Sequence, residues 1–176
     1  MIDLFVLRHG DASFDAPSDD LRELSVRGHN EVKLVYNEIL DSLEGLTSIF
    51  VSPYRRAQQT ADIMCDALDV SFQKQHRLVR SDMALLTPEA DRNKLIQFLF
   101  DYVQNSVAEQ RHKILLVSHQ PLVSCLLTAL CDPVSQRNPN SFAESKYSMG
   151  TANLAYVKLN VMAAGCGELC WMTKPT

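Results

Sequence analysis

The residues best suited to chemistry in this chain are histidines and arginines that directly follow short apolar runs. The three segments are Arg8-His9-Gly10, Ser52-Pro53-Tyr54-Arg55-Arg56 and Ser118-His119-Gln120-Pro121. An arginine carries a planar fork of N–H donors that matches the oxygens of a phosphate. A neutral imidazole can attack phosphorus and carry the phosphoryl group until water removes it. Arginines and a second, protonated imidazole would stabilise the transferring charge, so these residue types predict phosphoryl transfer on an anionic ligand without a metal.

The apolar runs before these segments are residues 2–7, 48–51 and 114–117, and each has the length of a strand buried on both faces of a parallel sheet. Helical stripes lie between and after them: Val32, Val35, Tyr36, Ile39, Leu40 and Leu43; Ala57, Ala61, Met64 and Leu68; Leu95, Leu99, Tyr102 and Val103; and Leu122, Val123, Leu126, Leu127 and Leu130. Ser25 is placed to cap the first helix, and Pro121 suits the first turn of the last. This alternation predicts an α/β fold with a mostly parallel sheet, in which ligands bind at the carboxyl ends of the strands.

The C-terminal part of the chain has a different pattern. Residues 152–161 alternate apolar and polar, residues 163–167 supply turn residues, and residues 168–172 read as a returning strand. We expect a hairpin that adds antiparallel strands at an edge of the sheet. Residues 131–150 are rich in Pro, Asn and Ser and are expected to form a surface loop.

Length and composition set limits on function. A chain of 176 residues with 46% hydrophobic and 22% charged positions predicts a single domain, 1–176. The net charge of −4 does not favour nucleic-acid or anionic-membrane binding. Five cysteines, an odd number, without a signal peptide or an apolar membrane span, predict reduced thiols and a cytoplasmic protein. We expect no metal and no cofactor, because no carboxylate accompanies the two histidines and no Gly-rich nucleotide loop is present.

Several motifs in order resemble the histidine phosphatase superfamily, and within it the SixA-type phosphohistidine phosphatases. They run from Ile2 to Leu126 and comprise Arg8-His9-Gly10-Asp11-Ala12, Asp19 to Arg22, Leu24, Ser25, Gly28, Val51-Ser52-Pro53, Arg56-Ala57, Gln59-Thr60, Leu86-Thr87-Pro88, Val117-Ser118-His119 and Pro121-Leu122-Val123. The resemblance implies a phosphoglycerate mutase-like fold, a three-layer α/β/α sandwich. No segment is long enough for the inserted helices with which larger members cover small substrates, so we expect no cap domain.

The resemblance also implies roles for individual residues. His9 would be the phosphorylated nucleophile, and Arg8, Arg56 and His119 would form the phosphate pocket with it. Arg22 and Asp19 match a segment near the entrance of the site and are expected to contact substrate. Arg55 falls outside the family pattern and is expected to serve the surface.

Two positions depart from the family pattern. Many members carry Asn or Thr where this chain has Asp15, and a carboxylate beside a phosphate is unfavourable, so Asp15 should turn away or meet an arginine. Members acting on oxygen esters supply a carboxylic acid to the leaving group, and here Asp82 is the best candidate general acid, with Glu89 and Asp91 nearby. Even so, a simple exposed loop aspartate describes Asp82 better than a general acid does.

The lack of a clear general acid in the sequence fits one leaving group in particular. The imidazole of a phosphohistidine departs readily once its free nitrogen is protonated, whereas an alkoxide needs an acid. The prediction is therefore hydrolysis of phosphohistidine on a protein through a phospho-His9 intermediate. The resemblance implies the histidine-containing phosphotransfer domain of a two-component sensor kinase, or a phosphocarrier of a phosphotransferase system, as the partner, with inorganic phosphate as product. Two alternatives stay open: a small-molecule phosphatase of the same superfamily, acting for instance on sugar phosphates, and a non-catalytic phospho-binding module.

Overall fold

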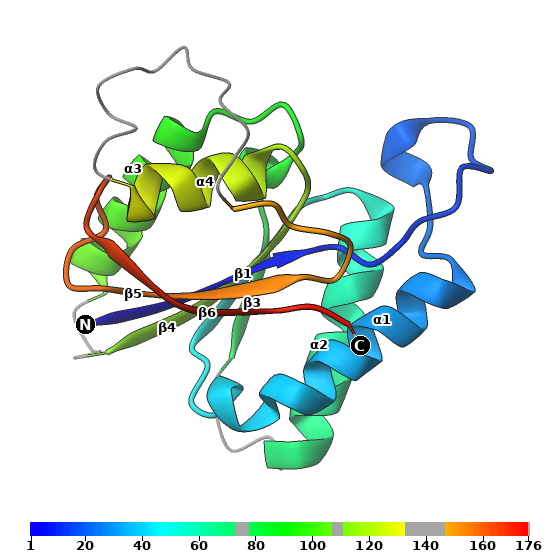
Figure 1. Cartoon of the computed structure of the whole chain (residues 1–176), viewed down its shortest axis with the longest axis horizontal. Coiled ribbons are helices and arrows are strands. Elements are labelled where there is room, and N and C mark those ends of the chain that lie inside the picture. The colour runs from blue at the N-terminus through cyan, green and yellow to red at the C-terminus, as the bar shows by residue number, and fades with distance from the viewer. Residues whose placement is uncertain (73–77, 107–110, 133–146, 176) are drawn as a thin grey trace.

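Six strands form one sheet in the order β3-β2-β4-β1-β5-β6 (Figure 1). The computed structural model describes residues 1–72, 78–106, 111–132 and 147–175. The strands are β1 (Ile2–Arg8), β2 (Ser48–Val51), β3 (Val79–Asp82), β4 (His112–Ser118), β5 (Leu154–Leu159) and β6 (Gly167–Thr173). The first four run parallel to one another, and β5 and β6 are antiparallel additions at one edge. The predicted mostly parallel sheet and the C-terminal hairpin are therefore confirmed.

Helices cover both faces of this sheet and complete three layers (Figure 1). They are α1 (Val26–Ile39), α2 (Arg55–Phe72), α3 (Arg92–Asn105) and α4 (Leu122–Cys131), with short 3-10 turns η1 (Asp19–Leu21), η2 (Leu40–Leu43) and η3 (Ala84–Leu86). On β1, Phe5 and Leu7 pack with α1 and α2, whereas Leu4 and Val6 pack with α3 and α4. Burial of each such side chain is worth about 1.5–3 kcal/mol, so both helical layers are held to the sheet by its two apolar faces.

The helix ends follow local sequence chemistry. The Ser25 hydroxyl accepts a hydrogen bond from the Gly28 backbone N–H, as predicted for the cap of α1. Asp91 caps α3 in the same way by accepting from Asn93 N–H, a cap that the sequence analysis did not identify. Pro121 stands at the N-cap of α4, one position before the first helical residue.

Strand β3 was missed by the sequence analysis. It holds one apolar residue, Val79, which is exposed, and it lies at the outer edge of the sheet beside β2. An exposed edge strand carries no run of buried residues, so the signal that revealed the central strands was absent. Most of the predicted surface loop 131–150 lies outside the described residues.

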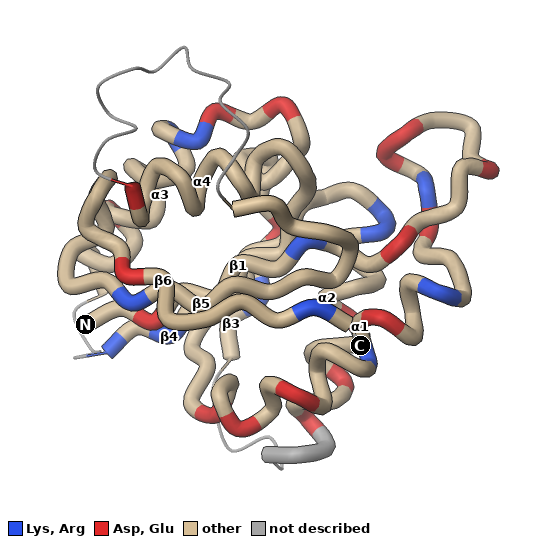
Figure 2. Tube along the Cα trace, in the orientation of Figure 1, with Lys and Arg blue, Asp and Glu red and all other residues tan. Residues whose placement is uncertain are grey.

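The segment from Asp11 to Arg27 carries five acidic residues and two arginines, and it projects from the sheet as an arm (Figure 2). A bridge between Ala12 and Leu24 closes the base of this arm. The five cysteines all lie in the described ranges, and no disulfide joins any of them. Within the described part of the chain, no helix is both long and apolar enough to cross a membrane.

Candidate active site

The strand order brings the three predicted segments to one place. β4 lies between β1 and β2, and His9 N–H and Ser52 N–H donate to the carbonyls of Ser118 and Val117 at the end of β4. His9 follows β1, His119 follows β4, and Arg56 occupies the first turn of α2 after β2. A pocket of about 250 Å³ opens there, lined by Arg8, His9, Asp11, Ala12, Phe14, Arg22, Arg56, His119, Gln120 and Thr151.

The His9 ring is buried and held in one tautomer. Its Nδ1 lies 2.7 Å from the Gly10 carbonyl oxygen, and the Arg56 Nε–H donates to its Nε2 at 3.1 Å. Because a guanidinium can only donate, Nε2 carries the lone pair and the ring proton is on Nδ1. Burial lowers the pKa of His9 to about 4, and the nearby arginine charges act in the same direction, against the Gly10 hydrogen bond. His9 is thus a neutral imidazole with its lone pair in the pocket, which is the form that a nucleophile needs.

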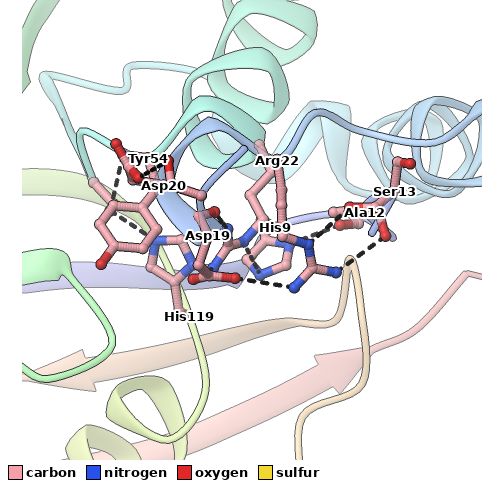
Figure 3. A network of polar contacts seen from close by, with 12 residues as sticks. His9, Ala12, Ser13, Asp19, Asp20, Arg22, Tyr54 and His119 are labelled. Atoms are coloured by element: carbon pink, nitrogen blue, oxygen red, sulfur yellow. Dashed lines mark hydrogen bonds and ion pairs between the residues drawn. The ribbon is translucent and has the colours of Figure 1, made fainter. Parts of the chain in front are cut away.

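Arg56 and Arg22 share one carboxylate, that of Asp19, and Figure 3 shows Asp19 paired with Arg22. Arg56 Nη2 lies 2.9 Å from one Asp19 oxygen and Arg22 Nη1 lies 3.0 Å from the other. Arg56 Nη1 also donates to the Asp19 backbone carbonyl. Burial raises the pKa of Asp19, but the hydrogen bonds from Arg56 and Arg22 outweigh it and lower the pKa overall. An anionic side chain therefore lies between the two guanidinium groups.

The other arginine donors are only partly free for a ligand. Arg8 Nη1 donates to the Met149 carbonyl at 2.8 Å, whereas its buried Nε has no partner. Arg22 Nε donates to the Ser13 carbonyl at 2.7 Å, and the guanidinium stacks over the Phe14 ring at 4.1 Å. Both side chains line the pocket. Arg8 Nε is therefore a free donor suited to a phosphate oxygen, whereas each Arg22 nitrogen is already bonded, Nη2 to the Ala12 carbonyl at 3.3 Å.

His119 lies beside His9 and lines the same pocket. The ring lies 4.9 Å from that of His9, centroid to centroid, and its Nε2 is 2.7 Å from the Ser52 hydroxyl. Burial, followed by the influence of His9 and the Arg56 charge, lowers the pKa of His119 to about 2. These surroundings favour the neutral ring, because a buried cation among arginines is unfavourable, and the protonated imidazole expected beside the transferring charge stays a prediction.

Two glycines allow the first loop to fit against α1. A Cβ on Gly10 would lie 2.7 Å from the Gly28 carbonyl oxygen, and one on Gly28 would lie 2.0 Å from the Asp11 carbonyl oxygen. The α2 residues of the motif brace the same loop: Thr60 Oγ1 accepts from Gly10 N–H at 3.2 Å, and Gln59 Oε1 accepts from Leu24 N–H at 2.7 Å. Gly10, Gly28, Gln59 and Thr60 therefore support the loop, and none of these four residues lines the pocket.

Three other candidates lie outside the pocket. Asp82 ends β3, is exposed and accepts a hydrogen bond from Gln58 at 3.0 Å. Asp15 is exposed and turned away, which is one of the two arrangements predicted for it. Arg55 pairs with Glu23 at 3.2 Å on the surface, as expected.

Several residues in or beside the pocket received no role from the sequence. Tyr54 packs its ring against His119 at 5.0 Å and lies under Arg56, and its place in the second segment was the available signal. Gln120 lines the pocket, and its place directly after His119 was the available signal. Phe14 and Thr151 line the pocket without any chemical signature in the sequence. In the described ranges, no group of three His, Cys, Asp or Glu side chains could hold a metal ion.

Comparison with known proteins agrees with this geometry. Residues 4–87 match a family model described as histidine phosphatase superfamily (branch 1). The chain is 29% identical over 172 residues to phosphohistidine phosphatase SixA of Escherichia coli strain K12, covering 98% of this chain and 93% of that one. It is 31% identical over 146 residues to a SixA homolog of Haemophilus influenzae, covering 80% and 82%. A solved structure of the protein histidine phosphatase SixA complexed with tungstate superposes with a TM-score of 0.75 at 29% identity, covering 98% of this chain and 97% of that one.

Proposed function

Because this chain belongs to the histidine phosphatase superfamily and is a hydrolase of its SixA-like group, we propose that it hydrolyses phosphohistidine on another protein through a phospho-His9 intermediate. One observation carries the proposal: the proton of His9 is held at Nδ1, and the lone pair at Nε2 accepts only from Arg56 in a pocket lined by Arg8, Arg22 and Arg56. We also propose that residues 1–176 act as one catalytic domain in the cytoplasm.

In the first step, His9 Nε2 attacks the phosphorus of the substrate. The new N–P bond forms as the N–P bond of the substrate phosphohistidine breaks, and the substrate imidazole leaves as a neutral ring if its other nitrogen carries a proton. The guanidinium groups of Arg8, Arg22 and Arg56 bind the equatorial oxygens, on which the charge is spread. Arg56 must first turn its Nε–H from His9 to the phosphoryl group, which frees the lone pair.

In the second step, water attacks the phosphorus of phospho-His9. The N–P bond to His9 breaks, inorganic phosphate leaves with the hydroxyl from water, and the second proton of the water is released to the phosphate or to solvent. The His9 Nδ1–H remains bonded to the Gly10 carbonyl, so His9 also departs from phosphorus as a neutral imidazole. Neither step requires a carboxylic acid, which fits the position of Asp82 outside the pocket.

The mouth of the pocket supports a protein substrate. Phe14 lines the pocket and is nevertheless 88% exposed, and Leu21, on η1 next to Asp19, is 52% exposed. Large exposed apolar side chains beside a site are typical of protein interaction surfaces. We propose that they contact the surface around the phosphohistidine of a histidine-containing phosphotransfer domain or a phosphocarrier.

A rate comparison on a phosphohistidine protein and a panel of sugar phosphates tests this function. We expect hydrolysis of the phosphoprotein to be faster by orders of magnitude, and comparable rates on both would refute the specificity. Brief mixing with ³²P-labelled substrate should label wild type and His29→Ala, whose histidine lies on α1 outside the pocket, but not His9→Ala. Absence of label in wild type would instead favour a binding module.

A further inference from the structure

We propose that Ser52 is a positioning residue that holds neutral His119 in the tautomer whose Nδ1–H faces the transferring phosphoryl group. The role of this donor rests on the proposed phosphoryl transfer. The tautomer itself is a property of the resting protein, so the two can be tested separately.

The Ser52 hydroxyl is rigidly placed. Ser52 directly follows β2, has no exposed surface, and donates its backbone N–H to the Val117 carbonyl on β4, two residues before His119. Its Oγ lies 2.7 Å from His119 Nε2 and accepts a longer hydrogen bond of 3.4 Å from the Tyr54 backbone N–H. The pairing joins residues 67 positions apart at the carboxyl ends of two adjacent strands.

Counting donors and acceptors selects one orientation for this pair. Since Tyr54 N–H already donates to Ser52 Oγ, the Ser52 proton needs an acceptor, and His119 Nε2 is the one the structure offers. A neutral imidazole that accepts at Nε2 carries its proton at Nδ1. In the opposite orientation the buried Ser52 proton would have no acceptor among the contacts of Ser52, which is costly.

His119 Nδ1 is the atom left for a ligand. It is buried and has no hydrogen-bond partner, and His119 lines the pocket. A phosphate oxygen would accept from Nδ1–H and satisfy it, whereas a bare Nδ1 lone pair would repel the same oxygen. Burial and the positive surroundings keep the ring neutral, so the donor is preorganised without adding another cation.

The two histidines are thus oriented in opposite senses. On His9 the Gly10 carbonyl accepts a hydrogen bond from Nδ1–H, which leaves the Nε2 lone pair on the pocket side of the ring. On His119 a side-chain hydroxyl occupies Nε2 and leaves a proton toward the pocket. One ring is the nucleophile and the other a neutral hydrogen-bond donor.

Nitrogen-15 NMR of the histidine rings tests the tautomer in the resting protein, with His119 assigned by its absence in His119→Asn. We expect a protonated Nδ1 and an unprotonated Nε2 in wild type. Ser52→Ala should lose this pattern and bind inorganic phosphate about tenfold more weakly, within the range of one hydrogen bond to a charged group. Ser52→Thr, which keeps the hydroxyl, should retain both properties.

Ser118→Ala is the matched control. Ser118 is equally buried, precedes His119 and donates to the Leu86 carbonyl instead of a histidine, so its loss should leave the tautomer unchanged. A proton on Nε2 in wild type, or an unchanged tautomer and phosphate affinity in Ser52→Ala, would overturn the proposal. A protein with Nδ1–H that binds phosphate but never hydrolyses phosphohistidine would refute the proposed function and leave this inference standing.

Discussion

Acidification from pH 7 to pH 5 tests whether the fold holds His9 neutral. The pKa of His9 is about 4 instead of 6.5, because the ring is buried and the Arg56, Arg8 and Arg22 charges oppose protonation. At pH 5 a ring of ordinary pKa is about 97% protonated, whereas one with a pKa near 4 is about 90% neutral. The nucleophile should therefore stay available at a pH where an exposed histidine would not.

The lowered pKa of His9 also makes the stability of the fold depend on pH. The unfolded chain binds a proton at His9 as the pH falls through 6.5, while the folded chain does not until about pH 4. The stability associated with neutral His9 is complete above pH 6.5 and is lost progressively as the pH falls toward 4. For this group alone the free energy of unfolding decreases by about 2 kcal/mol between pH 7 and pH 5.

Urea unfolding of wild type and His9→Asn at both pH values measures this difference. Wild type should lose about 2 kcal/mol more than His9→Asn on acidification, since the variant has no imidazole at this position to protonate. His29→Asn, altered on α1 outside the pocket, should behave like wild type. An equal loss in wild type and His9→Asn would refute the assignment of His9 as a buried neutral base.

Four further substitutions address the pocket and its surroundings. Asp19→Asn should tighten inorganic phosphate binding by about 3- to 10-fold in a calorimetric titration, because it removes the negative charge between Arg22 and Arg56. Weaker binding would mean that the Asp19 carboxylate chiefly positions the two arginines. Gly10→Ala should lower the free energy of unfolding in urea by about 1–3 kcal/mol, because its Cβ would lie 2.7 Å from a carbonyl oxygen of α1. Phe14→Ser should raise KM for the phosphoprotein by about 3- to 10-fold and leave the rate of hydrolysis of a small phosphoramidate within about 2-fold of wild type. The control Val161→Ser, at the distant β5–β6 turn, should change neither value, and equal effects of Phe14→Ser on both substrates would show that Phe14 acts in the phosphoryl transfer itself. Asp82→Asn should keep phosphohistidine hydrolysis within about 3-fold of wild type in steady-state assays, and a loss near 100-fold would restore Asp82 as a general acid.

The central fold was predictable because its signals are local and strong. β1, β2 and β4 are nearly continuous apolar runs, and four-residue spacing marks the helices that pack on them. Edge strand β3 was not predictable in this way, because Val79–Asp82 is mostly polar and its pairing with β2 depends on a partner 31 positions earlier in the chain.

The sequence by itself determined which residue types stand at the ends of the buried strands: Arg8 and His9, Arg56, and His119. That pattern was enough to predict an anionic ligand and a histidine nucleophile, since strand ends in a parallel sheet meet at one edge. Tertiary structure alone decided how those side chains are held. The Arg56–His9 and Ser52–His119 contacts span 47 and 67 positions, and they assign the tautomers because each depends on which hydrogen-bond partner the fold places beside a ring nitrogen. Burial, likewise a property of the packed molecule, lowers the pKa of both imidazoles and so favours their neutral forms.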